Sequence, residues 1–258
     1  LPATCAARFL FNGLRGQLPE KRDRQMASEN WELARIALNS RTRAIFLHGP
    51  PGTGKTYTAA REGLGGRECF MVTLTPETPS SEGRGHYMPT GGEFMWSDGV
   101  FIRAMREGHR LVLNEISHAS EDVLAILYPL LEGAETARLT LPTGETVHAH
   151  ERFQCVVTDN NDMDSLLGAL QSRLAVRVHI DTPHPAALAQ LPEKYREAAR
   201  RGYASFREGS PESITMRSWL AIVALERDGV SPSDAFALAF GRERGLMIHE
   251  SLSIDASA

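Results

Sequence analysis

The sequence predicts an α/β fold in which a parallel five-stranded sheet is sandwiched by helices and followed by a small helical domain. Short apolar runs alternate with helical patterns up to about residue 180, as is typical of a parallel sheet covered on both faces. A glycine-rich segment joins the first apolar run to the helix that follows it. After Pro183 and Pro185 the apolar runs stop, and only helical patterns follow.

Five apolar runs carry the predicted sheet, and each is short and sharply bounded, as buried strands are. Helical patterns separate them, and one of these contains Pro129, which should kink the helix. Residues 75–99 are rich in Pro, Gly, Ser and Thr and indicate a loop or hairpin, and a further hairpin is expected at 139–149. The strands are assigned to 44–48, 69–74, 111–115, 153–158 and 175–180, and the helices to 54–62, 100–108 and 121–133.

The chain divides into three predicted parts. Residues 1–43 form a polar N-terminal segment in which 31–38 has helical spacing, 44–182 form the large α/β domain, and 183–258 form a small helical lid domain. A domain of about 75 residues buries little apolar surface by itself. We therefore expect the lid to lean on the large domain or on a neighbouring subunit.

Composition excludes several classes of protein. The 28 Lys and Arg residues against 32 Asp and Glu give a net charge of −4, which provides no global field for nucleic acid and makes it an unlikely partner. No apolar run approaches the roughly 18 residues of a membrane span. The cysteines, Cys5, Cys69 and Cys155, are scattered and form no C-x-x-C pair, so they indicate neither zinc nor a disulfide framework and favour a reducing, cytoplasmic setting.

The strongest motif is GPPGTGKT at residues 49–56, which matches G-x-x-x-x-G-K-[ST] in full between a strand and a helix. The glycines let backbone N–H groups wrap round phosphate oxygens, Lys55 adds a cation for the outer phosphates, and the Thr56 hydroxyl can ligate Mg²⁺. A glycine-rich turn with an incidental lysine fits this pattern poorly. The predicted nucleotide-binding residues are Gly49, Pro50, Pro51, Gly52, Thr53, Gly54, Lys55, Thr56 and Tyr57.

The run LVLNE supplies the second half of such a site, because ligands bind at the carboxyl edge of parallel sheets. Glu115 is placed to polarise an attacking water as general base. Asn114 takes the position that usually holds a Mg²⁺-orienting Asp. An amide oxygen can accept the same hydrogen bond, but the lost charge weakens metal affinity by on the order of 1–3 kcal/mol. We therefore expect a hydrolysing enzyme with altered Mg²⁺ dependence, the alternative being that Glu115 is a solvated acid at a strand end.

The next strand ends in VVTDNN, which places Thr158 and Asn160 at its tip, beside Asn114 and Glu115 if the strands are neighbours. An amide there can hold the attacking water opposite Glu115. The alternative is an Asp-Asn turn whose side chains cap their own backbone.

Two arginines are candidates for balancing charge on the phosphates. Arg173 lies at the end of a helix just before the fifth strand, where it would suit a finger that reaches the nucleotide of a neighbouring subunit. Arg217 lies near the start of a helix in the lid and would contact phosphates in its own chain. A helix-dipole partner and a solvated face, respectively, are equally compatible with the spacing.

Taken in order, these motifs resemble the AAA+ ATPase superfamily and, more narrowly, its MoxR-like group of dynein-related type. The resemblance begins at about residue 40 and covers most of the chain. It implies that Asn160 is sensor 1, that Arg173 is the finger acting in trans and that Arg217 is sensor 2. The segments that carry it are GPPGTGKT, GGEFMWSDGVFIRAMREGHRLVLNEI, VLAILYPLLEG, LPTGETV, FQCVVTDNN, ALQSRL and ITMRSWLAI.

The resemblance also implies ATP and Mg²⁺ as cofactors, a homo-oligomer in the form of a hexameric ring, a protein client and, in many members, a partner with a von Willebrand factor A domain. It places a hairpin, here around residues 76–95, at the central pore. The chain departs from the group in having Asn114 for Asp and VVTDNN for Ala-Thr-x-Asn, and the first departure bears on turnover rather than on nucleotide binding. The alternatives are an ATP-gated scaffold with little turnover and a nucleic-acid-associated NTPase.

Overall fold

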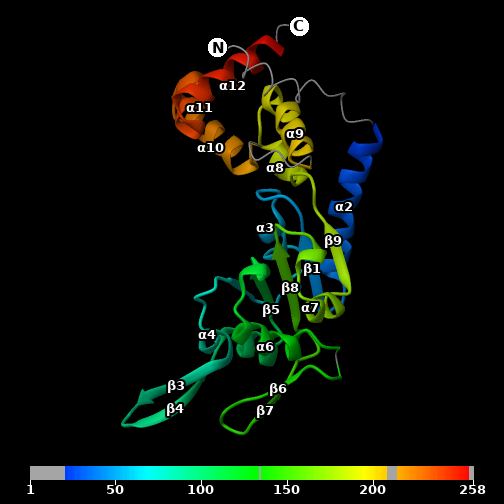
Figure 1. Cartoon of the computed structure of the whole chain (residues 1–258), viewed down its shortest axis with the longest axis vertical. Helices are drawn as coiled ribbons and strands as arrows, with labels where there is room; N and C mark the ends of the chain where they lie inside the picture. Colours follow the sequence, from blue (N-terminus) through cyan, green and yellow to red (C-terminus); the bar gives the residue numbers. More distant parts are fainter. Residues whose placement is uncertain (1–20, 134, 208–213, 256–258) are drawn as a thin grey trace. The chain divides into compact units, whose positions relative to one another are not determined.

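The computed structural model describes residues 21–133, 135–207 and 214–255, and Figure 1 shows the whole chain. The chain forms two compact units. Among the described residues, an α/β unit holds 30–49 and 55–180, while a helical unit holds 21–29, 50–54, 181–207 and 214–255. The domain boundaries given above stay predictions, and the first 20 residues of the predicted N-terminal segment lie outside the described residues.

The α/β unit is built on a five-stranded parallel sheet in the order β2-β5-β8-β1-β9, which confirms the predicted fold class. Every residue of β1 and of β8 is buried, because these strands have neighbours on both sides and helices on both faces. The order also sets β8 between β1 and β5, so the carboxyl ends of these three strands meet. The strands are β1 Ala44–His48, β2 Cys69–Thr73, β5 Arg110–Asn114, β8 Gln154–Asp159 and β9 Val176–His179.

Two apolar clusters, one on each face, hold the helices against the sheet. On one face Ile45 and Leu47 pack with Trp31 and Leu38 of α2, while on the other Phe46 packs with α5, α6 and α7. Alternate residues of one strand thus serve opposite faces. The helices with residues in this unit are α2 Lys21–Asn39, α3 Lys55–Ala59, α4 Ser80–Arg84, α5 Val100–Glu107, α6 Glu121–Leu130 and α7 Gly168–Arg173, with 3₁₀ turns η1 Ile116–His118 and η2 Met163–Ser165.

Several boundaries of helices and strands differ from those predicted, among them the ends of α3, α6 and β5. Helix α3 ends at Ala59 rather than at residue 62, because the chain turns into the left-handed Gly63, where a Cβ would lie 2.6 Å from the carbonyl oxygen of Leu38. Helix α6 ends at Leu130 rather than at residue 133, so Pro129 lies inside the helix, in its last turn. Strand β5 ends one residue before Glu115.

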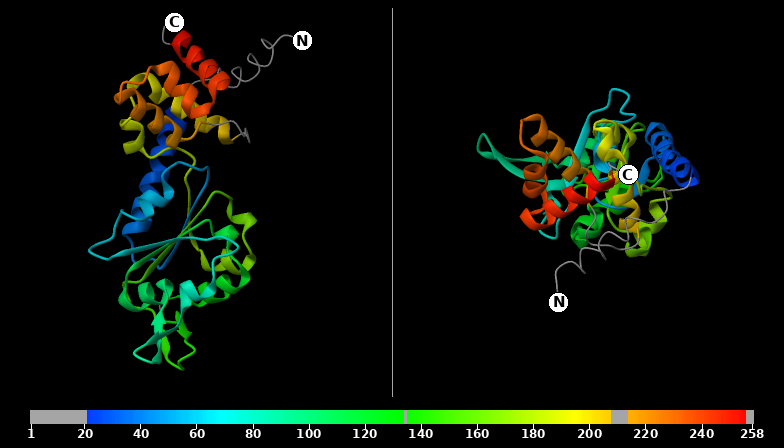
Figure 2. Two further views of the ribbon diagram at one scale, coloured as in Figure 1. Left: turned by 90° about the vertical axis from the view of Figure 1, so that its left-hand side faces the viewer. Right: turned by 90° about the horizontal axis from the view of Figure 1, so that it is seen from above.

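Two antiparallel hairpins extend from the same end of the α/β unit (Figure 1 and Figure 2). Gly91 and Gly92, both with positive φ, form the turn of the first, which follows the short helix α4. Its tip carries exposed apolar side chains, among them Phe94 with 74% of its surface exposed. The strands are β3 Gly85–Thr90 with β4 Glu93–Asp98, and β6 Arg138–Thr140 with β7 Thr146–His148.

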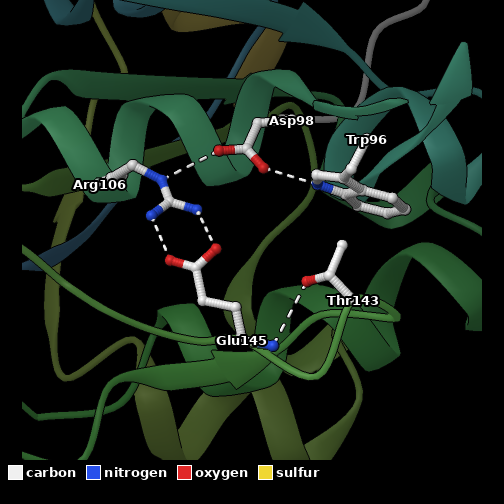
Figure 3. A network of polar contacts seen from close by, with 5 residues as sticks. All are labelled: Trp96, Asp98, Arg106, Thr143 and Glu145. Atoms are coloured by element: carbon white, nitrogen blue, oxygen red, sulfur yellow. Dashed lines mark hydrogen bonds and ion pairs between the residues drawn. The ribbon is translucent and has the colours of Figure 1, made fainter. Parts of the chain in front are cut away.

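Arg106 of α5 links the base of the first hairpin, at Asp98, to the loop of the second, at Glu145, as Figure 3 shows. Its Nε donates to Asp98 Oδ2 at 3.0 Å, and its two terminal nitrogens contact both oxygens of Glu145. Asp98 in turn accepts from Trp96 Nε1 at 2.7 Å. Because a guanidinium that grips a carboxylate through two nitrogens fixes direction as well as distance, the two hairpins share one anchor.

The helical unit contains helices and loops but no strand in the part of the chain described, as predicted for the residues after the sheet. Tyr195, Trp219 and Phe236 pack ring against ring in its core, at centroid distances of 5.4–6.0 Å. None of the helices in the described parts of the chain is sufficiently long and apolar to cross a membrane. The helices are α8 Pro185–Ala189, α9 Glu193–Arg207, α10 Met216–Arg227, α11 Pro232–Phe240 and α12 Arg242–Asp255.

Arg110, the first residue of β5, is completely buried in the α/β unit. Its guanidinium donates to the carbonyl oxygens of Leu38 and Ala59, both at 2.8 Å, as well as to those of Glu62 and Gly63 and to the side chain of Gln154. Burial lowers the pKa of the Arg110 guanidinium to about 10, so it stays charged at neutral pH. The cation thus caps the carboxyl ends of α2 and of the α3 segment, where the helix dipoles are negative.

We expect Arg110→Met to lower the free energy of unfolding by about 3 kcal/mol or more, because several buried carbonyl oxygens lose their donor at once. Urea denaturation measures this change. Arg138→Met, at an exposed position in β6, is the matched control and should change stability by less than about 0.5 kcal/mol. Equal losses for the two variants would show that the buried contacts contribute nothing.

Candidate functional site

The candidate site lies at the carboxyl edge of the sheet, within the α/β unit. Lys55 and Thr56 begin α3, Asn114 ends β5, and Asn160 follows the last residue of β8. The strand order places these ends side by side, although the residues lie up to 105 positions apart in the chain. This edge is where parallel α/β sheets bind their ligands.

Lys55 is buried, with 5% of its surface exposed. Its ammonium donates to the carbonyl oxygen of Gly49 at 2.7 Å and to Asn160 Oδ1 at 3.3 Å. A Cβ at Gly49 would lie 2.3 Å from the carbonyl oxygen of Ile180, and the φ of 127° also requires glycine. The motif glycine therefore lets β1 leave the sheet tightly and places its carbonyl against the lysine.

Thr56, Asn114 and Thr158 form a compact group of oxygen atoms. Asn114 Oδ1 accepts from the Thr56 hydroxyl at 2.8 Å and from the Thr158 hydroxyl at 2.7 Å, and the two hydroxyl oxygens lie 3.3 Å apart. Hydroxyl and amide oxygens are hard donors that suit Mg²⁺, so the predicted pair of Thr56 and Asn114 fits this cation in chemistry and in position.

Glu115 has a left-handed backbone, with φ 60° and ψ 53°. It is the one non-glycine residue of the described chain with positive φ, a conformation that costs about 1–3 kcal/mol. Its backbone N–H donates to the carbonyl oxygen of Thr158 at 2.9 Å. With this backbone the chain leaves the direction of the strand at Glu115. The local sequence does not predict the left-handed turn, because the residue there is neither Gly nor Asn.

Asn160 joins the acid to the lysine. Its Nδ2 donates to Glu115 Oε1 at 2.8 Å, while its Oδ1 accepts from Lys55. One amide thus contacts both the predicted base and the predicted phosphate-binding cation. The neighbouring Asp159, which the sequence did not single out, is buried and accepts from the N–H groups of Ser117 and Asn161. The self-capping turn considered for this segment is therefore made by Asp159, and it leaves Asn160 available to the site.

Other predicted site residues are the rest of the loop, Tyr57 and Arg217. Residues 50–54 belong by their contacts to the helical unit, with Gly52 and Gly54 at positive φ. Tyr57 is 65% exposed, with the Arg61 guanidinium 4.1 Å from its ring centroid. Arg217 is an exposed residue in the first turn of α10, in the helical unit, and its role stays a prediction.

Arg173 ends α7, as predicted, and is held within its own chain. Its Nε and Nη2 lie 2.8 and 2.7 Å from Glu132 Oε1, and Nη1 donates to the carbonyl oxygen of Ala169. The guanidinium also lies 5.0 Å from the ring centroid of Tyr128. All three guanidinium nitrogens thus have partners within the chain.

A separate cluster at the same sheet edge consists of His48, Asp162 and His179, whose donor atoms lie within 4.8 Å of one another. Two imidazoles and a carboxylate are donors that zinc accepts. The geometry is also explained without metal, since His48 Nδ1 lies 3.0 Å from Asp162 Oδ1 and the two imidazole rings stack. Burial lowers the pKa of His48, against the opposing effect of Asp162, so the imidazole favours its neutral form.

Together, the glycine-rich loop after β1 and the polar residues at the ends of β5 and β8 define a nucleotide-binding protein of the P-loop class. The chain belongs to the AAA domain family, dynein-related subfamily, whose family model matches residues 44–174, and to the MoxR-like group of the AAA+ superfamily. The resemblance stated from the sequence motifs is thereby confirmed.

Two curated relatives illustrate the match. Protein NorQ of Paracoccus denitrificans (strain Pd 1222) is 33% identical over 154 residues, which cover 57% of this chain and 56% of NorQ. Protein CbbQ of Hydrogenophilus thermoluteolus is 24% identical over 213 residues, which cover 76% of this chain and 78% of CbbQ. The match therefore spans little more than half of the length of NorQ.

The fold is shared with more distant structures. The crystal structure of NtrX from Brucella abortus aligns with a TM-score of 0.50 and 16% identity, over 89% of this chain and 67% of that chain. At this level of identity the likeness concerns the arrangement of helices and strands.

The strained backbone of Glu115 makes a test of stability possible. We expect Glu115→Gly to be more stable than Glu115→Ala by about 1 kcal/mol, because glycine adopts positive φ without a steric penalty. Urea denaturation of both variants gives the difference. In the exposed middle of α6 the order should reverse, with Ala125→Gly losing about 1 kcal/mol. A glycine at 115 that is no more stable than alanine would contradict the strain.

Proposed function

We propose that this chain is an ATP-hydrolysing AAA+ protein that acts as an oligomeric ring and remodels a protein client. The observation that carries hydrolysis is the Asn160 amide, which contacts both Glu115 and the buried Lys55. A carboxylate held beside a phosphate-binding lysine is positioned to act on a water molecule that attacks the outer phosphate.

The residues divide the work of binding. The N–H groups of the loop at 49–56 and the Lys55 ammonium would hold the phosphates. Thr56 would ligate Mg²⁺ directly and Asn114 would hold it through a bound water. When bound, the ion would neutralise charge on the phosphate oxygens. The contact between Thr56 and Asn114 at 2.8 Å supports this assignment, because both side chains then face one position.

Glu115 would accept a proton from the attacking water, and Asn160 would orient that water and the carboxylate together. The hydrogen bond between Asn160 Nδ2 and Glu115 Oε1 fixes the direction of the carboxylate. The Oδ1 of the same amide accepts from Lys55. A shift of the lysine toward phosphate would therefore also change the position of the Glu115 carboxylate. Nucleotide binding and water activation would thus be coupled through one side chain.

The remaining assignments come from the family. Arg173 would stabilise charge on the nucleotide of a neighbouring subunit, and Arg217, in a lid formed by residues 183–258, would contact phosphate in its own chain. A hexameric ring would set the two hairpins around a pore. The exposed Phe94 on the first hairpin supports contact with a protein client. A partner with a von Willebrand factor A domain belongs to the same proposal.

A second candidate function is an ATP-gated scaffold that assembles with nucleotide and turns it over slowly. Asn114 favours it, because the site lacks one negative charge next to the expected cation. The base and its partner Asn160 are intact, which favours the enzyme. Measured turnover separates the two.

We expect Glu115→Gln to release phosphate at least about 100-fold more slowly than the wild type while still binding ATP, because the amide cannot accept the proton. Phosphate release and binding of a fluorescent ATP analogue measure the two properties. Glu121→Gln, at an exposed position that begins α6, is the matched control and should keep the wild-type rate. Equal rates for Glu115→Gln and wild type would favour the scaffold.

The finger role of Arg173 is tested by mixing two inactive chains. Arg173→Ala should lose about 1,000-fold in rate, and the second chain carries Glu115→Gln, whose expected loss is at least about 100-fold. In mixed rings some sites combine an intact Glu115 with an intact Arg173 from the neighbour, so part of the activity should return. Native mass spectrometry verifies that mixed oligomers form. Mixed rings without any regained activity would rule out action in trans.

A further inference from the structure

The Asn114 amide is held from two sides. Its Oδ1 accepts from Thr56 at 2.8 Å and from Thr158 at 2.7 Å. Thr158 is fully buried and stands directly opposite Asn114 in the pairing of β5 with β8, so its hydroxyl cannot swing out to water. Thr56 belongs to the motif, whereas no role in the reaction has yet been given to Thr158.

An amide at this position raises a problem that a carboxylate does not. The two ends of an Asn side chain have nearly the same shape, yet one accepts hydrogen bonds and the other donates them. In the opposite orientation Nδ2 would direct an N–H group at the Thr56 oxygen and occupy a lone pair that a cation needs. An Asp side chain presents an oxygen in either orientation.

The Thr56 hydroxyl sets the direction that is required. If its oxygen ligates a cation, its proton must go to an acceptor on the protein side, and Asn114 Oδ1 is within hydrogen-bond distance. The amide must therefore keep its oxygen toward Thr56. In the structure the Thr158 hydroxyl is a second donor to the same oxygen, so the amide directs its oxygen at Thr56.

We propose that Thr158 is a positioning residue that keeps the Asn114 amide oxygen directed at Thr56 and so makes an uncharged side chain usable at the Mg²⁺ site. This inference rests on the proposed function for the identity of the ligand. The contact should matter while position 114 holds an amide and should become dispensable once Asn114→Asp supplies a carboxylate.

A double-mutant cycle tests this dependence. Wild type, Thr158→Val, Asn114→Asp and the double variant are titrated with Mg²⁺ in the presence of a fluorescent, non-hydrolysable ATP analogue, and the apparent Mg²⁺ affinity is read from analogue binding. We expect Thr158→Val to weaken Mg²⁺ binding about fivefold, as loss of one hydrogen bond would, and to weaken it less than about twofold when combined with Asn114→Asp. Affinity for the analogue in EDTA should be equal in all four proteins.

The controls separate positioning from packing. Thr158→Ser keeps the hydroxyl and should match the wild type. Thr58→Val removes a hydroxyl from a buried threonine that makes no hydrogen bond to Asn114 in the part of the chain described, and it should leave Mg²⁺ affinity unchanged. If Thr158→Val does not fold, as judged by its thermal unfolding midpoint, the Thr158→Ala and Thr158→Ser pair makes the same comparison.

Three outcomes would overturn the inference. Equal weakening by Thr158→Val with and without Asn114→Asp would assign Thr158 a packing role, and unchanged Mg²⁺ affinity in both cases would show that the contact is idle. Both results leave Mg²⁺-dependent nucleotide binding by the wild type intact, so the proposed function would stand. Wild-type protein that binds the analogue with no dependence on Mg²⁺ would overturn the inference and the proposed cofactor together.

Discussion

Strand β8 lies between β1 and β5, and the chemistry at the sheet edge depends on that pairing. The chain after β1 delivers Lys55 and Thr56, β5 delivers Asn114 and Glu115, and β8 delivers Thr158 and Asn160. The contacts between these side chains cross from one of the three segments to another. A shift of β8 by one residue would turn Thr158 to the other face of the sheet and break the contact with Asn114.

The two ends of β5 have different roles: the side chain at its start donates hydrogen bonds, and the one at its end accepts them. Its first residue, Arg110, is a buried cation that holds the carboxyl ends of α2 and of the α3 segment. Its last residue, Asn114, is a neutral acceptor at the ligand edge. Because α3 also carries Lys55 and Thr56, the same five-residue strand fixes the helix at one end and meets its functional side chains at the other. The helix that carries Lys55 and Thr56 is therefore held at the amino end of β5, opposite to the edge where the ligand would bind.

The elements of the fold were predictable to the extent that they depend on local pattern. Buried strands such as β1 are continuous apolar runs, and the phosphate loop is a fixed motif, so both can be found in the sequence. The left-handed turn at Glu115 could not be predicted, because it is imposed by contacts with β8 rather than by the residue itself. The short α3 and the double contact on Asn114 escaped prediction for the same reason: they depend on partners tens of residues away.

Arg106 couples the movements of the two hairpins, because it contacts both of them. Arg106 lies on α5, and only two residues separate that helix from β5. A force on either hairpin would therefore be transmitted to α5 through the same side chain. Helix α5 leads directly into β5, the strand that ends in Asn114. Without the contacts of this guanidinium to Asp98 and Glu145, each hairpin could still fold by itself. The two hairpins would then move independently instead of as one body.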